Sequence, residues 1–349
     1  MSCSQSAMKR CRNSSRLRLA VIAFAWACMP TAFTGQIRHT LRSRSPHRTT
    51  TRAMATDDVA ACIYDLGFGE LVKSQPLGSS DWSSFKKITT SSGKDLFVKT
   101  STKSVAQMFK PEALGLKALR DATVHDGVMK IPEVYAAANM KQGLGSYIVM
   151  EYLRLGGRGD DRALGRAMGL MHAHQPQNAK GFGFDVDNTI GATTQLNAWS
   201  SDWVEFFRDR RLQFQVKRAG DGYVSSLFKS IAPRMGKLFD GIQVKPSVLH
   251  GDLWSGNIGS ADGLPCIFDP ATYYGHHEAE WGMSWAASLS SSFWKGYREV
   301  IPKDPGFDDR ASLYEAYHQL NHYNLFGGGY LNAAVSCLEA VKSSLDEKE

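Results

Sequence analysis

Apolar residues fall in short runs between residues 84 and 153, with lengths typical of strands. Residues 84–90 and 95–100 are predicted to be two strands, joined by Ser91-Ser-Gly-Lys94, a sequence typical of a turn. Lys99 closes the second run directly after three apolar residues, so this strand is expected to be buried. Residues 146–153 form a third apolar run suited to a buried strand. These runs predict a small sheet in the first half of the chain.

Helices are expected between these strands and through most of the second half. The segments predicted to be helical are residues 111–120, 162–173, 199–212 and 312–345. Pro111 suits the first turn of a helix, and the glycines that begin at Gly327 are expected to break the last segment in two. In the third segment Arg208, Arg210 and Arg211 are expected to face outward. The pattern predicts an α+β chain whose second half is mostly helical.

Composition changes this picture only at the N-terminus. The 349 residues are 43% hydrophobic, and their formal net charge is +7. No acidic residue precedes Asp57, whereas ten of the 41 lysines and arginines do, which leaves 31 basic against 34 acidic residues in the remainder. The basic balance therefore belongs to the first 56 residues. Nucleic-acid binding by the folded part loses its main electrostatic support.

The first 56 residues are predicted to be a disordered targeting leader. A basic stretch precedes the apolar segment 19–29, which is shorter than the ~18 residues of a membrane span. An acid-free stretch rich in Arg, Ser and Thr follows, to about Ala55. This order, with Phe33 between the two parts, resembles the bipartite plastid leaders of algae with secondary plastids. A plastid address is predicted, with a mitochondrial presequence or a secretory signal as the alternative. No membrane contact is expected after the leader is removed.

Cysteines and histidines beyond the leader predict neither a disulfide framework nor a metal site. Cys62, Cys266 and Cys337 are widely spaced and odd in number, so buried free thiols are expected. His172 and His174 are two residues apart in a predicted helix and therefore do not share a face.

One segment carries the candidate chemistry. His250-Gly-Asp-Leu-Trp-Ser-Gly-Asn257 has the pattern H-x-D-x-x-x-x-N, and Asp269 follows it twelve residues later. Phosphoryl transfer from ATP uses an Asp that orients the acceptor hydroxyl and takes its proton, with an Asn and a second Asp that hold Mg²⁺. We therefore predict Asp252 as the catalytic base, and Asn257 and Asp269 as metal ligands. Each piece also occurs in ordinary turns, so the prediction depends on partners upstream.

A lysine and a glutamate upstream are predicted to complete the charge pattern. Lys99 closes a buried strand, and an unpaired buried ammonium group is costly, so a charged partner is needed. Glu112 lies in the first turn of the predicted helix 111–120, from which it could reach Lys99. A solvated glutamate, favoured there by the helix dipole, is the alternative.

Two further segments are predicted to contact the nucleotide. Residues 77–84 contain Gly78, Ser79 and Ser80, whose backbone amides could approach the phosphates. This is not a Walker loop, and a plain surface loop is the alternative. Glu151 and Leu153, at the end of the third apolar run, are predicted at a hinge that contacts adenine, with an ordinary turn as the alternative.

Together these segments resemble the fructosamine kinases, also called ketosamine-3-kinases, which are relatives of the aminoglycoside phosphotransferases and choline kinases. The resemblance runs from about Asp58 to the C-terminus and is most specific at Leu253-Trp-Ser-Gly-Asn257 and Tyr273-Tyr-Gly-His-His-Glu278. It implies an α+β, bilobal protein-kinase-like fold. Its small ATP-binding N-lobe (residues 57–153) would be an antiparallel sheet plus a helix, and its larger C-lobe (residues 154–349) mostly helical and catalytic. It also implies ATP and Mg²⁺.

The resemblance implies phosphorylation of the third-carbon hydroxyl of a ketoamine, on a protein or a free glycated amine, which initiates deglycation. Trp254 is expected to pack its indole face against the sugar or the amine, or else to serve as loop packing. Glu278 and Glu280 are expected to meet the same amine, or to be solvated. A kinase for another polyol or amino alcohol and a nucleotide-binding regulator without turnover are the alternatives.

The chain departs from the family's pattern in three places. His277 stands where the family often has Arg, and Glu280-Trp281 where it often has an acidic-Leu pair. The phosphate loop lacks the Cys that many eukaryotic members carry, so a disulfide-switched dimer is not expected. We expect a monomer or a weak dimer. No core catalytic group is missing, which argues against an inactive pseudokinase.

Overall fold

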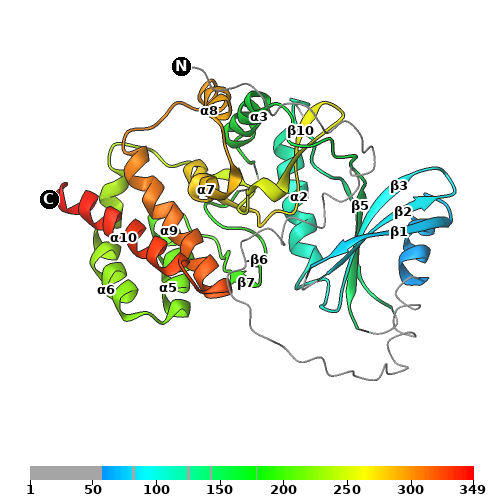
Figure 1. Cartoon of the computed structure of the whole chain (residues 1–349), viewed down its shortest axis with the longest axis horizontal. Coiled ribbons are helices and arrows are strands. Elements are labelled where there is room, and N and C mark those ends of the chain that lie inside the picture. Colours follow the sequence, from blue (N-terminus) through cyan, green and yellow to red (C-terminus); the bar gives the residue numbers. More distant parts are fainter. Residues whose placement is uncertain (1–56, 81–82, 124–125, 142–143, 178) are drawn as a thin grey trace, which may run out of the picture.

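A computed structural model describes residues 57–349, except residues 81–82, 124–125, 142–143 and 178. The predicted leader, residues 1–56, lies outside this part. None of the helices in the described part combines the length and apolar character that a membrane span requires. The first part of the chain forms an antiparallel sheet and the second part is mostly helical (Figure 1), which confirms the predicted α+β class.

Five strands form the sheet, in the order β1-β2-β3-β5-β4, with antiparallel neighbours throughout. Their bounds are β1 (Leu71–Ser79), β2 (Ser84–Thr90), β3 (Asp95–Ser101), β4 (Val134–Asn139) and β5 (Ser146–Glu151). The three predicted strands are confirmed as β2, β3 and β5. The sequence did not predict β1, because it is a mostly exposed edge strand without alternation of apolar and polar residues.

The two faces of the sheet pack against different helices, following the two-residue period of a strand. Val98 joins the core formed with a helix over residues 57–65. Ile148, the cross-strand partner of Lys99, joins the core on the other face with α2 (Phe109–Thr123). Lys99 therefore faces α2, and its side chain reaches the first turn of that helix.

Helix α2 also packs against the second part of the molecule. A Cβ atom on Gly115 would lie 2.9 Å from Thr272 Oγ1 and 3.5 Å from Pro270 Cγ. Only glycine allows this approach, so α2 is held directly against the segment that follows Asp269. Figure 1 shows α2 between the sheet and the helical part.

The second part consists of helices and three two-stranded ladders. The helices are α3 (Asp161–Ala173), α4 (Trp203–Phe206), α5 (Gln213–Ala219), α6 (Gly222–Ile231), α7 (Ser284–Ala287), α8 (Ser291–Arg298), α9 (Phe307–Phe326) and α10 (Tyr330–Asp346), with short turns η1 (Phe207–Leu212), η2 (Ala232–Phe239), η3 (Ser255–Asn257) and η4 (His277–Met283). The ladders pair β6 (Asn188–Ile190) with β7 (Thr193–Gln195), β8 (Ser247–Leu249) with β11 (Tyr273–Gly275), and β9 (Ile258–Ala261) with β10 (Leu264–Ile267). The predicted break between the last two helices is confirmed at Gly327, which has φ +68°.

The prediction that Arg211 faces outward is wrong. Residues 207–212 form a π-helical turn, which is wider than an α-helical turn and rotates the following side chains relative to the predicted face. Arg211 is fully buried, with its guanidinium 4.6 Å from the centre of the Phe206 ring and 4.1 Å from that of Tyr273. It also donates a hydrogen bond to Asn197 Oδ1 at 2.6 Å. The arginine is therefore part of the core.

The three cysteines of the described part are free thiols, as predicted. Cys266 is buried, and burial raises the pKa of its thiol to about 12. Cys62 and Cys337 are half-buried, so the expectation of full burial holds for Cys266 alone.

Candidate active site

The loop after β8 begins with a buried histidine that joins two segments of the predicted site. His250 Nδ1 lies 3.3 Å from the backbone nitrogen of Asp252, and Nε2 lies 3.0 Å from the carbonyl oxygen of Phe268. Burial lowers the pKa of His250, so the ring is neutral. Nδ1 then accepts from the backbone of Asp252, and Nε2 donates to Phe268. The histidine holds this loop, residues 250–257, beside Asp269; it is called the Asp252 loop below.

Asp252 is half-buried in this loop, and its carboxylate has an unusual environment. No residue of the described ranges donates a hydrogen bond to that carboxylate. Burial raises its pKa to about 7, and the negative charges of Asp269 and Glu280 act in the same direction. A carboxylate whose pKa is near 7 is well matched to take a proton from a hydroxyl group at neutral pH.

Asn257 and Asp269 offer oxygen atoms close to the Asp252 loop. Asn257 Nδ2 donates to the carbonyl oxygen of Asp252 at 2.8 Å and lies 3.4 Å from that of Asp269, so Oδ1 is the atom left for a ligand. The side chain of Asp269 is 55% exposed, and its backbone has φ +61°, which is uncommon for a residue other than glycine. One carboxylate and one amide oxygen, open to solvent on the carboxylate side, fit the hard-oxygen preference of Mg²⁺.

Lys99 joins the sheet, α2 and Asp269 in one charge cluster. Its Nζ lies 2.7 Å from Glu112 Oε1 and 2.6 Å from Asp269 Oδ1, so the predicted contact with Glu112 is present. Burial alone would lower the pKa of Lys99, but the two carboxylates raise it above its usual value, and the lysine is charged. Burial alone would raise the pKa of Asp269, but Lys99 outweighs it and lowers that pKa, so Asp269 is ionised.

A double-mutant cycle tests whether Lys99 and Glu112 act as one unit. We expect the losses in kcat/KM caused by Lys99→Ala and Glu112→Ala to be strongly non-additive, with an interaction energy of about 0.5–3 kcal/mol. The reason is that Glu112 acts through the ammonium group that it holds. Lys87 and Asp95 supply a matched control, because they form an ion pair of the same 2.7 Å length in the same sheet. A cycle on that pair should leave kcat/KM unchanged, and additive losses at Lys99 and Glu112 would contradict the functional link.

Glu280 holds the start of the Asp252 loop in place. Its Oε2 accepts from the backbone nitrogen of His250 at 2.6 Å, and its Oε1 from that of Gly251 at 2.9 Å. His172 Nε2 lies 3.4 Å from the same carboxylate. Burial alone would raise the pKa of Glu280, but the hydrogen bond from His172 lowers it, so the side chain is ionised. The expectation that Glu280 meets substrate or solvent is wrong, because all of these partners are buried.

The change Glu280→Gln should weaken both the fold and turnover. The amide NH₂ of glutamine would face a backbone N–H group, which leaves a buried donor unpaired and costs about 1–3 kcal/mol of unfolding free energy. Because the Asp252 loop loses an anchor, we expect kcat to fall while KM for ATP changes little. Denaturant unfolding and steady-state kinetics measure the two effects. The control is Glu347→Gln at the exposed C-terminal end, and an unchanged kcat in a folded Glu280→Gln protein would reject the positioning role.

Glu278 is also placed differently from the prediction. It is buried, and both of its carboxylate oxygens accept from Arg310, at 2.7 Å from Nε and 2.8 Å from Nη2. Arg310 is itself fully buried and donates to the carbonyl oxygens of Leu238 and Pro305. A glutamate that is buried and paired in this way is not accessible to a substrate amine, so the substrate assignment of Glu278 is wrong.

The hairpin between β1 and β2 lies over Lys99. Gly78 pairs with Phe85, and Ser79 is the last residue of β1, so these residues end a strand instead of preceding the first one. Phe85 is the cross-strand partner of Lys99, and Lys99 Nζ lies 5.8 Å from the centre of its ring. Ser80 begins the turn of the hairpin. The predicted phosphate loop is therefore next to the predicted phosphate-binding lysine. Two of its predicted residues lie outside the described ranges, Asp81 and Trp82.

Glu151 and Leu153 lie where the chain leaves the sheet. Glu151 is the last residue of β5, and its backbone nitrogen donates to the carbonyl oxygen of Glu133 at 2.7 Å. Leu153 is half-buried, and Gly156 N then donates to Ser260 O at 2.8 Å. This connection joins the sheet to β9, which follows the Asp252 loop.

Trp254 is half-buried and packs on its own loop. A Cβ atom at residue 256 would lie 2.3 Å from Trp254 Cη2, so the ring lies directly over Gly256. The ring therefore covers the backbone between Asp252 and Asn257, in agreement with the loop-packing alternative.

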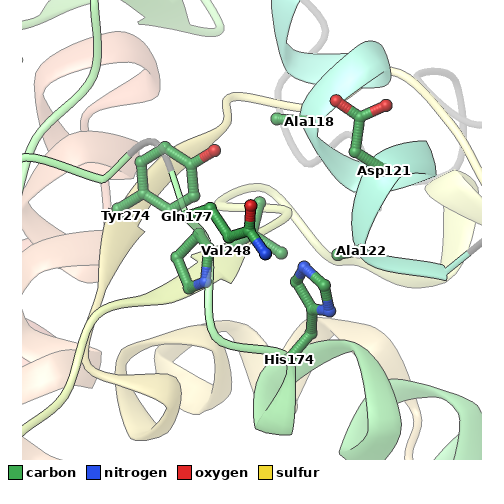
Figure 2. A pocket seen from close by; sticks show the side chains of 8 residues that line it. Ala118, Asp121, Ala122, His174, Gln177, Val248 and Tyr274 are labelled. Atoms are coloured by element: carbon green, nitrogen blue, oxygen red, sulfur yellow. The ribbon is translucent and has the colours of Figure 1, made fainter.

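A separate cavity of about 220 Å³ lies beside the C-terminal half of α2 (Figure 2). Figure 2 shows side chains from α2, from the end of α3 and from the β8–β11 ladder around it. None of the predicted site residues lines this cavity. Its lining consists of Ala118, Asp121, Ala122, His174, Pro176, Gln177, Val248 and Tyr274.

Comparison with known proteins identifies relatives of this chain. The family model described as fructosamine kinase matches residues 70–344. The rice (Oryza sativa subsp. indica) protein named "Protein-ribulosamine 3-kinase, chloroplastic" is 47% identical over 249 residues, which cover 70% of this chain and 71% of the rice protein. A crystal structure from Thermobifida fusca YX-ER1, described as a fructosamine-3-kinase, superposes with a TM-score of 0.69 at 27% identity, covering 82% of this chain and 98% of the other. The aminoglycoside phosphotransferase APH(4)-Ia, at 14% identity, shares the fold with a TM-score of 0.51, covering 84% of this chain and 99% of its own.

Proposed function

The chain belongs to the fructosamine kinase family, and from that premise we propose that it transfers the γ-phosphate of ATP to the third-carbon hydroxyl of a ketoamine. One observation carries the proposal. The carboxylate of Asp252, whose pKa is about 7, lies in a loop that Asn257 and His250 tie to Asp269, and Asp269 is paired with Lys99. A basic carboxylate beside a lysine-held acid is the set of groups that phosphoryl transfer requires.

Asp252 orients the acceptor hydroxyl and takes its proton. The hydroxyl oxygen forms a bond to the γ-phosphorus, the bond from that phosphorus to the bridging oxygen breaks, and ADP leaves. Lys99, held by Glu112, binds the α- and β-phosphates, and the hairpin with Gly78, Ser79 and Ser80 closes over them. These groups act by positioning the reactants and by stabilising the transferred charge.

Asn257 and Asp269 would hold Mg²⁺, which would neutralise negative charge on the phosphates. The fit is chemical: both side chains offer oxygen atoms, and Asp269 stays ionised beside Lys99. Glu151 and Leu153 contact adenine from the connection between the sheet and the helical part.

The acceptor is a sugar joined to an amine as a ketoamine, free or on a protein. Support comes from the relative named as a ribulosamine 3-kinase. Trp254 offers a second support, because the ring stands two residues from Asp252 and can stack on the sugar while it packs on Gly256. Phosphate at the third carbon is a leaving group, so the product breaks down and releases the amine. The protein would in this way initiate deglycation of damaged amines.

A panel of acceptors tests the proposal. With full-length protein and Mg·ATP, kcat/KM is measured for ribulose-lysine, fructose-lysine, an aminoglycoside and choline, with Asp252→Asn as the inactive control. We expect the ketoamines to give the highest values. A preference for the aminoglycoside or choline would leave the kinase chemistry standing and reject the substrate. ADP release that no acceptor stimulates would favour a nucleotide-binding regulator.

We also propose that the protein acts in the plastid as a monomer or weak dimer. The rice relative carries "chloroplastic" in its name, and residues 1–56 have the composition of a leader. Fluorescence of a fusion to residues 1–56 should appear in the plastid. Fluorescence in mitochondria or in the medium would contradict this address.

A further inference from the structure

A cluster of potential metal ligands lies at the start of η4, apart from the residues of the proposed reaction. His276, His277, Glu278 and Asp304 present ligand atoms that all lie within 4.8 Å of one another. The side chain of Asp304 is 41% exposed and that of His277 14%, so an ion can enter from solvent. Neither histidine contacts Asp252, Lys99 or Asp269 in a hydrogen bond or ion pair of the described structure.

The ion pair with Arg310 removes Glu278 from this set. Both oxygen atoms of Glu278 accept from the guanidinium of Arg310, and the two side chains compensate each other's charge. Three candidate ligands remain, two imidazole rings and the carboxylate of Asp304.

A chain of buried polar contacts occupies one of the two nitrogen atoms of His277. Glu280 is ionised, so His172 Nε2 carries the hydrogen that faces it. His172 Nδ1 lies 3.0 Å from the hydroxyl of Tyr297. His277 Nδ1 lies 3.2 Å from the same hydroxyl. Nε2 is therefore the nitrogen of His277 that this chain leaves for another partner.

His277 Nε2 faces a carboxylate. It lies 3.8 Å from Asp304 Oδ2, beyond hydrogen-bond distance. A cation placed between these two atoms would bind to both of them.

His276 supplies the second imidazole. Its Nδ1 lies 2.7 Å from the hydroxyl of Tyr314, which also accepts from Trp203 Nε1 at 3.0 Å. Nε2 is therefore the nitrogen that remains for a metal. Each histidine has its Nδ1 on a tyrosine hydroxyl, and such a second contact orients a metal-binding imidazole and fixes its tautomer.

We infer that His276, His277 and Asp304 form a binding site for a divalent transition-metal ion of the Zn²⁺ type. Two imidazole nitrogens and one carboxylate are a ligand set that Zn²⁺ takes, with water in the fourth position, whereas Mg²⁺ prefers oxygen atoms alone. The charges of Arg298 and Arg310 oppose a dication, so we expect affinity in the micromolar range. The metal would bind behind the Asp252 loop, at the outer end of the chain Glu280–His172–Tyr297–His277.

Titration of the full-length protein with ZnCl₂ and with CoCl₂ tests the site. The leader and the nucleotide site also contain possible ligands, so the result is the difference between wild type and variants. We expect His277→Gln and Asp304→Asn each to lose one bound equivalent and the visible absorption of tetrahedral Co²⁺. His174→Gln, a half-buried histidine outside the cluster, should keep both. Zn²⁺ should raise Tm in the wild type more than in either site variant.

Asp304→Asn is expected to stay folded, because the side chain of Asp304 is 41% exposed and asparagine has the same shape. Equal Tm values of wild type and variant without metal establish that both are folded. Binding of the same number of Zn²⁺ equivalents, with the same affinity, in wild type, His277→Gln and Asp304→Asn would overturn the inference. So would a wild-type protein that gains no cobalt absorption over the two variants.

Discussion

We expect Asp252→Asn to reduce kcat by at least about 100-fold and to leave the affinity for ATP nearly unchanged, since a general base contributes about 10²–10⁴-fold. The amide keeps the shape of the carboxylate but cannot accept the proton of the acceptor hydroxyl. Steady-state kinetics with a ketoamine give kcat, and equilibrium titration gives the ATP affinity. Asp240→Asn, at an exposed aspartate, should behave as wild type. An Asp252→Asn enzyme that keeps more than about a tenth of the wild-type kcat would show that Asp252 is not the base.

The pH dependence of the wild-type enzyme also tests whether Asp252 is the catalytic base. A base must be deprotonated to act, and burial raises the pKa of Asp252 to about 7. We therefore expect kcat/KM for the acceptor to fall as the pH drops below about 7. Positive charge from bound magnesium would move the midpoint downward, so increasing Mg²⁺ should shift the profile toward acid pH. A profile that is flat between pH 5 and 8 would contradict a base that titrates in this range.

The second large effect is expected for Asp269→Ala, which should remove most of the magnesium dependence of nucleotide binding. Loss of even an indirect metal contact weakens affinity by about 10–100-fold, and Asp269 is proposed as a direct ligand. Asn257→Ala should cost less, because a neutral amide oxygen is the weaker ligand for a hard cation. Magnesium titrations of nucleotide affinity compare the two variants with wild type.

Asp262 offers a matched control for Asp269. It is also an aspartate with a left-handed backbone, at φ +52° against +61°, and its side chain is 75% exposed on the turn between β9 and β10. Asp262→Ala should leave the magnesium dependence intact. Unchanged magnesium dependence in Asp269→Ala would reject the metal assignment, whereas equal losses in both variants would point to a general effect of the backbone.

Contacts that depend on neighbouring residues in the sequence could be predicted. The spacing from His250 to Asn257 describes one loop, and Asp269 follows at the end of the β9–β10 hairpin, so the spacing itself brings these groups together. The partner of Lys99 could be predicted because a lysine at the end of a buried strand needs a nearby charge, and Glu112 lies in the first turn of the next helix.

Contacts between distant segments could not be predicted in the same way. Glu278 and Glu280 are two residues apart and have the same charge, yet one pairs with Arg310 on α9 and the other with backbone groups at His250 and Gly251. The two glutamates have different partners only because η4 packs beneath the Asp252 loop. No local pattern of apolar residues predicts that packing. For Arg211 the missing information was the π-helical turn, which shifts the buried face by a fraction of a turn.

The close contact between Gly115 and Thr272 bears on how such an enzyme can be controlled. Kinases of this architecture can be switched by displacing the helix that carries the lysine's glutamate. Here that helix has no side chain at Gly115 to act as a spacer, and it rests directly on Pro270 and Thr272, in the segment that follows Asp269. Swinging it outward would expose buried surface without any gain in contacts. We therefore expect a constitutive enzyme whose rate follows the supply of ATP and of damaged amines, as suits housekeeping repair.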